Sequence, residues 1–133
     1  MKNYEFNLKT NFNEELIDIS TNIERFVSES KIEEGIALIF VPHTTAGITI
    51  NENADFDVKI DMLLGLKLAF PDRKEFRHFE GNSKAHIKAT VVGNSETIII
   101  ESGNLKLGRW QGIFFCEFDG PRNRKVFVKI IGK

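Results

Sequence analysis

The stretch of residues 76–90, FRHFEGNSKAHIKAT, separates a first half with two predicted helices from a second half of strand-like runs. Two of the three histidines of the chain, His78 and His86, fall within it. The alternation after His86 predicts a strand over residues 87–92, with Lys88 on its polar face. Histidine suits metal binding and proton transfer near neutral pH, so we expect the functional site to lie around this stretch.

Strand-like patterns account for most of the chain. Residues 36–41 form a continuous apolar run that predicts a strand buried on both faces, and Pro42 ends it because proline cannot donate to a ladder. Other runs with period-two alternation or flanking turn residues are residues 4–8, 46–53, 97–101, 113–118 and 126–131. These runs predict a mainly antiparallel sheet.

Two helices are predicted in the first half. Asn13 or Thr10 would cap the first, in which apolar residues recur at three- and four-residue steps over residues 16–27. Asp55 would cap the second, which extends to Phe70 and whose wide apolar stripe indicates burial on more than one side, as at a subunit contact. The class is therefore predicted to be α+β: a single domain over residues 1–133, a mainly antiparallel sheet or sandwich with two helices.

Composition excludes several classes of protein. A chain of 133 residues suits one domain, and its net charge of −1 argues against a nucleic-acid partner. No segment has the apolar length of a membrane span or of a signal peptide, so a cytoplasmic protein without a membrane partner is expected. The single cysteine, Cys116, allows no internal disulfide and lies in an apolar run, which predicts a buried, inert thiol.

Polar residues gather at the ends of the predicted strands. The histidines, His43, His78 and His86, are predicted ligands of a divalent metal ion, most of all zinc, because three imidazoles leave a fourth position for water or substrate. Lys88, Arg122 and Arg124 are candidate phosphate partners. Surface solvation is a competing explanation for Arg124 and Lys125, and helix capping is one for Asp55. The runs 117–122 and 108–112 are further polar clusters.

Five blocks of sequence carry a family resemblance: residues 42–46 (PHTTA), 50–55 (INENAD), 78–82 (HFEGN), 85–89 (AHIKA) and 107–113 (LGRWQGI). With them the chain resembles the YjbQ family, also called secondary thiamine-phosphate synthase, over nearly its whole length. The resemblance implies a YjbQ-like α+β homotrimer with polar pockets near its subunit contacts. It also implies coupling of hydroxymethylpyrimidine diphosphate to thiazole phosphate, as a secondary activity.

Carried over residue by residue, the family's histidine positions fall on the three histidines, its acidic and amide positions on Asn51, Glu52, Asp55 and Glu80, and its glutamine on Gln111. The predicted catalytic residues are Glu52, Glu80, Lys88, Gln111 and Arg122, and the predicted contacts to a small phosphorylated metabolite are Thr44, Thr45, Asn51, Asp55 and Asn82.

Two other hypotheses remain open: a metal- or anion-binding trimer without turnover, and a metal-dependent hydrolase of a phosphorylated metabolite. The chain has neither a glycine-rich phosphate loop nor an aspartate-rich magnesium motif, which weighs against a dedicated diphosphate enzyme.

Overall fold

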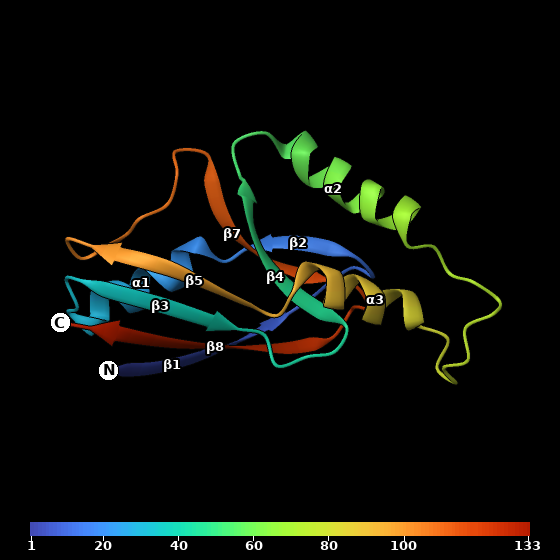
Figure 1. Cartoon of the computed structure of the whole chain (residues 1–133), viewed down its shortest axis with the longest axis horizontal. Coiled ribbons are helices and arrows are strands. Elements are labelled where there is room, and N and C mark those ends of the chain that lie inside the picture. The colour runs from blue at the N-terminus through green and yellow to red at the C-terminus, as the bar shows by residue number, and fades with distance from the viewer.

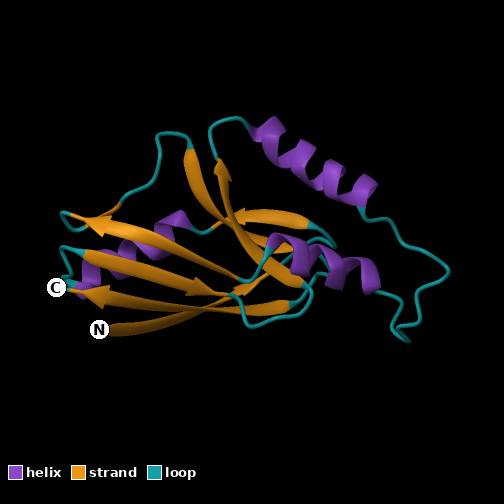
Figure 2. Cartoon of the chain, viewed as in Figure 1, coloured by secondary structure: helices purple, strands orange, loops and turns teal.

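A computed structural model describes residues 1–133, with two antiparallel sheets and three helices (Figure 1, Figure 2). The elements are β1 (Lys2–Lys9), β2 (Glu15–Asp18), α1 (Ser20–Ser30), β3 (Gly35–Phe40), β4 (Ala46–Glu52), α2 (Phe56–Ala69), α3 (Ser83–Val92), β5 (Ser95–Glu101), β6 (Asn104–Leu105), β7 (Gln111–Glu117) and β8 (Asn123–Gly132). The predicted α+β class with mainly antiparallel pairing is confirmed. The protein has a third helix, α3, besides the two that were predicted.

The two sheets share the main hydrophobic core. The larger has the strand order β1-β8-β3-β5-β6 and the smaller has the order β2-β7-β4. Helix α1 buries Ile23, Phe26 and Val27 in this core, against inward residues of both sheets such as Ile39 and Phe115. In Figure 1, α1 lies behind the larger sheet.

Strand β7 is the strand that is buried on both faces. Ile113 and Phe115 point into the main core, whereas Phe114 and Cys116 belong to a second core beneath α3 and α2. Burial raises the pKa of the Cys116 thiol to about 12, with a further contribution from Glu96, so the prediction of a buried, inert thiol is confirmed.

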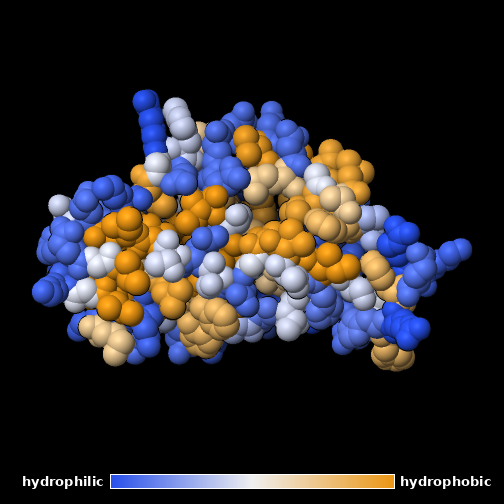
Figure 3. Space-filling view, viewed as in Figure 1, coloured by the Kyte–Doolittle hydropathy of each residue, from blue (hydrophilic) through white to orange (hydrophobic).

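Strand β3 was wrongly predicted to be buried on both faces. Ala37 and Ile39 are buried, but Ile36 and Phe40 are 38% and 39% exposed on the outer face of the larger sheet. Each has an apolar cross-strand neighbour, Ile99 beside Ile36 and Phe127 beside Phe40. Figure 3 shows apolar side chains over these strands.

The first helix begins later than predicted, because residues 15–18 form β2. This strand pairs with β7, and Leu16 packs into the second core. The carboxylate of Glu15 accepts the backbone N–H groups of Asn11 and Phe12, at 2.7 and 3.0 Å, so it holds a turn and not a first helical turn. Helix α1 then starts at Ser20.

Residues 87–92 belong to α3, so the predicted strand is wrong. Ala85 and Ala89, four residues apart, form the buried stripe that packs on β7. Lys88, expected on a polar strand face, is 1% exposed. A short apolar run fits the two-residue period of a strand as well as the 3.6-residue period of a helix. Here the helix forms, because the two small alanines let it approach the sheet closely.

Helix α2 spans the predicted residues and lies at the edge of the molecule, while its predicted burial on more than one side stays a prediction (Figure 1). The carboxylate of Asp55 caps it by accepting the N–H of Asp57 at 2.9 Å. None of its residues is buried within this chain, and an apolar stripe is exposed along it, made of Phe56, Ile60, Leu64 and Leu68. No helix in the structure combines the length and the apolar character that crossing a membrane requires.

Candidate functional site

A polar pocket of about 360 Å³ lies where three segments meet: the loop after β3, the residues that lead into α3, and the turn between β7 and β8. None of its lining residues is hydrophobic. The predicted site residues that it brings together are His43, His78, His86, Thr44, Thr45, Glu80, Asn82 and Arg122. Segments far apart in sequence therefore form one site, which we call the histidine pocket.

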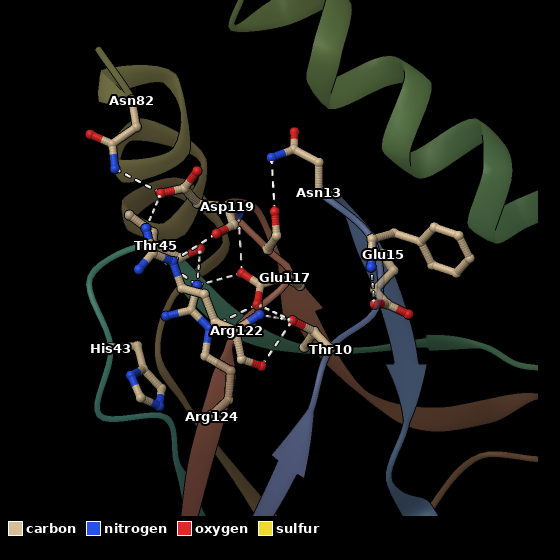
Figure 4. Close-up of polar contacts among 12 residues, drawn as sticks. Thr10, Asn13, Glu15, His43, Thr45, Asn82, Glu117, Asp119, Arg122 and Arg124 are labelled. Atoms are coloured by element: carbon tan, nitrogen blue, oxygen red, sulfur yellow. Dashed lines mark hydrogen bonds and ion pairs between the residues drawn. The ribbon is translucent and has the colours of Figure 1, made fainter. Parts of the chain in front are cut away.

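An ion pair between Glu117 and Arg124 lies at the base of the histidine pocket (Figure 4). Arg124 lines the pocket, yet it is only 5% exposed, and Glu117 is fully buried. Arg124 Nε donates to Glu117 Oε1 at 2.8 Å, and its Nη2 donates to the second carboxylate oxygen and to Thr45 Oγ1, the latter at 2.9 Å. The expectation that Arg124 is solvated at the surface is therefore wrong.

Hydrogen bonds keep Glu117 ionised despite its burial. Burial raises the pKa of this carboxyl, but hydrogen bonds from Arg124, from the backbone N–H of Asp119 and from Thr10 outweigh it, and the pKa lies below its ordinary value. The Thr10 hydroxyl donates to Glu117 Oε1 at 2.7 Å. The buried pair is thus fully hydrogen-bonded, which gives the pocket a rigid base.

A second carboxylate, Asp119, connects the wall of the pocket to the β7–β8 turn. Its Oδ2 accepts from Asn82 Nδ2 at 2.8 Å and from Arg122 Nη2 at 2.9 Å, and the same two partners hold its pKa below the ordinary value against the effect of burial. Asp119 in turn raises the pKa of Arg122. Asn82 Oδ1 is buried and has no hydrogen-bond partner, so it is available to a donor within the pocket.

The three histidines differ in their surroundings. His43 Nε2 accepts the backbone N–H of Lys125 at 2.9 Å. Burial and the nearby Arg124 guanidinium lower the pKa of His43. The rings of His78 and His86 meet edge to face, with centroids 5.1 Å apart, and His78 Nε2 lies 3.9 Å from Glu80 Oε1.

A site with three histidine ligands does not fit these residues as they are arranged. No group of three or more histidine, cysteine, aspartate or glutamate side chains is placed to hold a metal ion. His43 has a specific obstacle, because the hydrogen bond from Lys125 occupies the lone pair on Nε2. The zinc ion that was predicted at His43, His78 and His86 stays a prediction.

The remaining predicted site residues lie elsewhere. Lys88 Nζ pairs with Glu14 Oε2 at 2.6 Å, facing a separate cavity of about 280 Å³ beside the end of α2. Asn51, Glu52 and Gln111 lie at the far end of the smaller sheet, where Glu52 pairs with Gln111 in the β4–β7 register. Asp55 caps α2.

Three residues that build the site were not among the predicted site residues: Thr10, which was a candidate helix cap, and Glu117 and Asp119, which belong to the polar run 117–122. Glu14, the partner of Lys88 outside the pocket, was expected in the first turn of a helix. Glu117 did carry a signal, because it is a carboxylate within the apolar run IFFCEF. A charged residue inside a core strand requires a buried partner, and Arg124 is that partner. Thr10 and Glu14 have no comparable signal, since their partners are more than 70 residues away.

Comparison with known proteins places this geometry in a family. The model of the family described as "UPF0047 protein YjbQ-like" matches residues 4–133. A UPF0047 protein of Methanocaldococcus jannaschii is 58% identical over 129 residues, covering 97% of this chain and 94% of the relative. The UPF0047 protein YugU of Bacillus subtilis is 54% identical over 126 residues, covering 94% and 96%.

Solved structures agree with these sequence matches. A crystal structure of a YjbQ/UPF0047-family protein from Clostridium acetobutylicum, described as uncharacterized, has a TM-score of 0.94 and 58% identity, covering 96% of this chain and 99% of that one. A protein of unknown function from Sulfolobus solfataricus has a TM-score of 0.95 at 35% identity, covering 99% and 97%. The chain therefore belongs to the YjbQ-like UPF0047 family.

Proposed function

We propose that the histidine pocket binds a small phosphorylated metabolite. One observation carries this proposal: a single pocket without hydrophobic residues collects all three histidines of the chain together with two threonines, Asn82 and Arg122. Hydroxyl, guanidinium and imidazole groups are donors that suit phosphate oxygens. A ligand of this kind also matches the size of the pocket, which is about 360 Å³.

We further propose, from the family resemblance, that the chain couples hydroxymethylpyrimidine diphosphate to thiazole phosphate as a minor activity. Departure of diphosphate develops negative charge, which Arg122 and a protonated imidazole would stabilise. Glu80 lines the same pocket, where its carboxylate would stabilise the positive charge that develops on the rings as the thiazole nitrogen bonds to the pyrimidine methylene carbon and diphosphate leaves. No step in this proposal requires a metal ion.

Binding without turnover is the second candidate, and the ion pairs in the pocket favour it. Arg122 is paired with Asp119, and Arg124 is paired with Glu117. Each carboxylate offsets a positive charge that would otherwise stabilise a leaving diphosphate. The site would then hold a phosphorylated ligand more readily than it would accelerate the reaction.

We also propose a homotrimer. Support comes from two apolar surfaces that this chain leaves exposed: the stripe on α2, and the outer face of the larger sheet around Ile36 and Phe40. Large contiguous apolar surfaces are typical of subunit contacts. Light scattering with size-exclusion chromatography tests this assembly, and a monomer at micromolar concentration would rule it out.

The test of the function combines binding and product formation. Calorimetry should give micromolar affinity for hydroxymethylpyrimidine diphosphate, and thiamine phosphate should form when thiazole phosphate is added. Arg122→Ala should weaken binding by roughly ten- to 150-fold, since one charge-assisted hydrogen bond contributes roughly 1.5–3 kcal/mol. Arg73→Ala, which removes an exposed arginine paired with Glu75, is the matched control and should change nothing.

The outcomes separate the two candidates. Product that requires Arg122 supports the transferase, whereas binding with no product above an enzyme-free control supports the ligand-binding protein. Absence of binding by the unmodified protein to either phosphate compound contradicts both.

A further inference from the structure

His43 occupies an unusual position, because it lines three neighbouring cavities. Besides the histidine pocket, it borders a cavity of about 270 Å³ that it shares with His86, and another of about 570 Å³ between β1 and β8. The larger cavity is also lined by Lys9, Arg124 and Lys125, and by no acidic residue. A ligand in any of these spaces would contact the imidazole of His43.

The hydrogen bond from Lys125 fixes which nitrogen of His43 carries the proton. A backbone N–H can only donate, so Nε2, at 2.9 Å, must present its lone pair. The neutral ring then bears its hydrogen on Nδ1. Protonation of Nε2 would break this bond and place a cation beside Arg124.

The other nitrogen, Nδ1, makes no hydrogen bond within the chain. It is not a buried atom either, because the one buried side-chain nitrogen or oxygen atom without a partner is Asn82 Oδ1. Nδ1 is therefore accessible to a ligand. It offers a hydrogen and no lone pair, so it suits an acceptor such as an anionic oxygen and does not suit a metal ion.

We infer that His43 is a neutral hydrogen-bond donor, through Nδ1, to an anionic oxygen of the bound phosphate compound, and that it is not a metal ligand. The identity of the ligand rests on the function proposed above; the donor role rests on the Lys125 contact. The backbone of β8 thereby sets the ligand preference of a side chain in the loop after β3.

The charges around His43 favour the same state. Arg124, Lys125 and Lys9 border it, and the carboxylate of Glu117 is already paired with Arg124. Across the histidine pocket lie Arg122, His78, His86 and Glu80. Burial and Arg124 lower the pKa of His43 against a smaller opposing effect from Glu117, so a neutral ring at neutral pH agrees with the geometry.

The first test is nitrogen-15 NMR of the ligand-free protein at neutral pH, with His43→Ala used to assign the signals. Nδ1 of His43 should show the shift of a protonated nitrogen and Nε2 that of an unprotonated one. The opposite tautomer, with hydrogen on Nε2, overturns the inference whether or not any ligand binds.

The second test compares two variants with inorganic pyrophosphate as the probe. Asparagine can place an N–H near the position of Nδ1, so His43→Asn should bind pyrophosphate within about threefold of the unmodified protein, while His43→Ala should lose about tenfold. Equal losses in the two variants overturn the donor role. Circular dichroism and thermal unfolding verify that both variants fold.

The third test is titration with zinc alone. His43→Ala should bind zinc within about twofold of the unmodified protein, since the inference excludes His43 from any metal site. A tenfold or greater loss of zinc affinity overturns it. If the unmodified protein fails to bind pyrophosphate, the proposed function and the ligand assigned to His43 are both wrong. The NMR and zinc experiments still decide in that case whether His43 is a hydrogen-bond donor or a metal ligand.

Discussion

The two ends of the smaller sheet both carry polar residues, but under different physical conditions. At one end, Glu117 and Arg124 are buried and their partners include Thr10 and Thr45, far away in sequence. At the other end, the side-chain contact of Gln111 is local: its Oε1 accepts the N–H of Gly108 at 2.7 Å, in its own turn. Long-range, buried contacts hold several segments together, whereas local, exposed contacts shape only their own loop.

The largest expected effect is therefore at the buried end. Glu117→Ala leaves the Arg124 guanidinium buried without a counter-charge, and removing one member of a buried ion pair costs about 3–5 kcal/mol of unfolding free energy. Urea denaturation followed by circular dichroism measures the change. A loss below 1 kcal/mol would mean that this end is no more critical to stability than the exposed one.

Lowering the pH should reduce the free energy of unfolding through the buried end of the sheet, gradually and by less than Glu117→Ala does. Glu117 and Asp119 have folded pKa values below their ordinary values of 4.5 and 3.8, so the unfolded chain takes up protons first as pH falls. Their stabilising contribution is present above about pH 4.5 and is lost as pH falls through the folded pKa values.

The lowered pKa of His43 makes the free energy of unfolding depend on pH in the same direction, but at higher pH. The stabilising contribution of His43 is present above its ordinary pKa of 6.5 and decreases as pH falls below that value. Urea denaturation at a series of pH values measures both effects. Glu117→Gln should make the acid dependence less steep, and an unchanged pH dependence in this variant would contradict the assigned ionisation.

Lys88 provides an intermediate case, since it is a buried charge whose partner Glu14 is nearer to solvent, with 19% of its side chain exposed. Lys88→Met keeps the volume and removes the ion pair, so we expect a loss of about 1–3 kcal/mol in unfolding free energy. Pyrophosphate binding should be unchanged, because Lys88 does not line the histidine pocket. Weaker binding, measured by calorimetry on folded protein, would return Lys88 to the site.

The smallest effect should come from the exposed end. Gln111→Ala removes one local hydrogen bond on an exposed side chain, and we expect no more than about 0.5 kcal/mol of change in unfolding free energy. Glu52→Gln should be equally mild. If either variant abolishes thiamine-phosphate formation while leaving stability intact, the exposed end contributes to catalysis through a partner subunit.

Sequence predicted the parts of the fold that local patterns determine. Asp55 was correctly expected to cap α2, and the alternating and apolar runs located β1, β3, β4, β5, β7 and β8. Errors arose where two periods fit equally well: residues 87–92 alternate like a strand, but Ala85 and Ala89 also form a helical stripe. These residues form helix α3 because of tertiary packing, which the spacing of apolar residues along the sequence does not reveal.

The histidine pocket was predictable as a set of residues but not as a network. His43, His78 and His86 stood out because there are only three histidines in the chain. The tautomer of His43 depends on a backbone N–H that comes from Lys125, 82 residues away. Backbone donors leave no trace in the residue type, so no reading of side chains alone could have identified this contact.

Helix α2 has a consequence for the dynamics of the protein. A helix of 14 residues with no buried side chain, which contacts the second core only through partly buried residues such as Met62 and Leu66, opens at a smaller cost than a core strand, so in an isolated chain its amide hydrogens should exchange with solvent far faster than those of β7. Association of subunits over the exposed stripe would couple this local opening to dissociation. Exchange in α2, followed by mass spectrometry, should then accelerate on dilution while exchange in β7 stays constant, which makes the helix a built-in reporter of assembly.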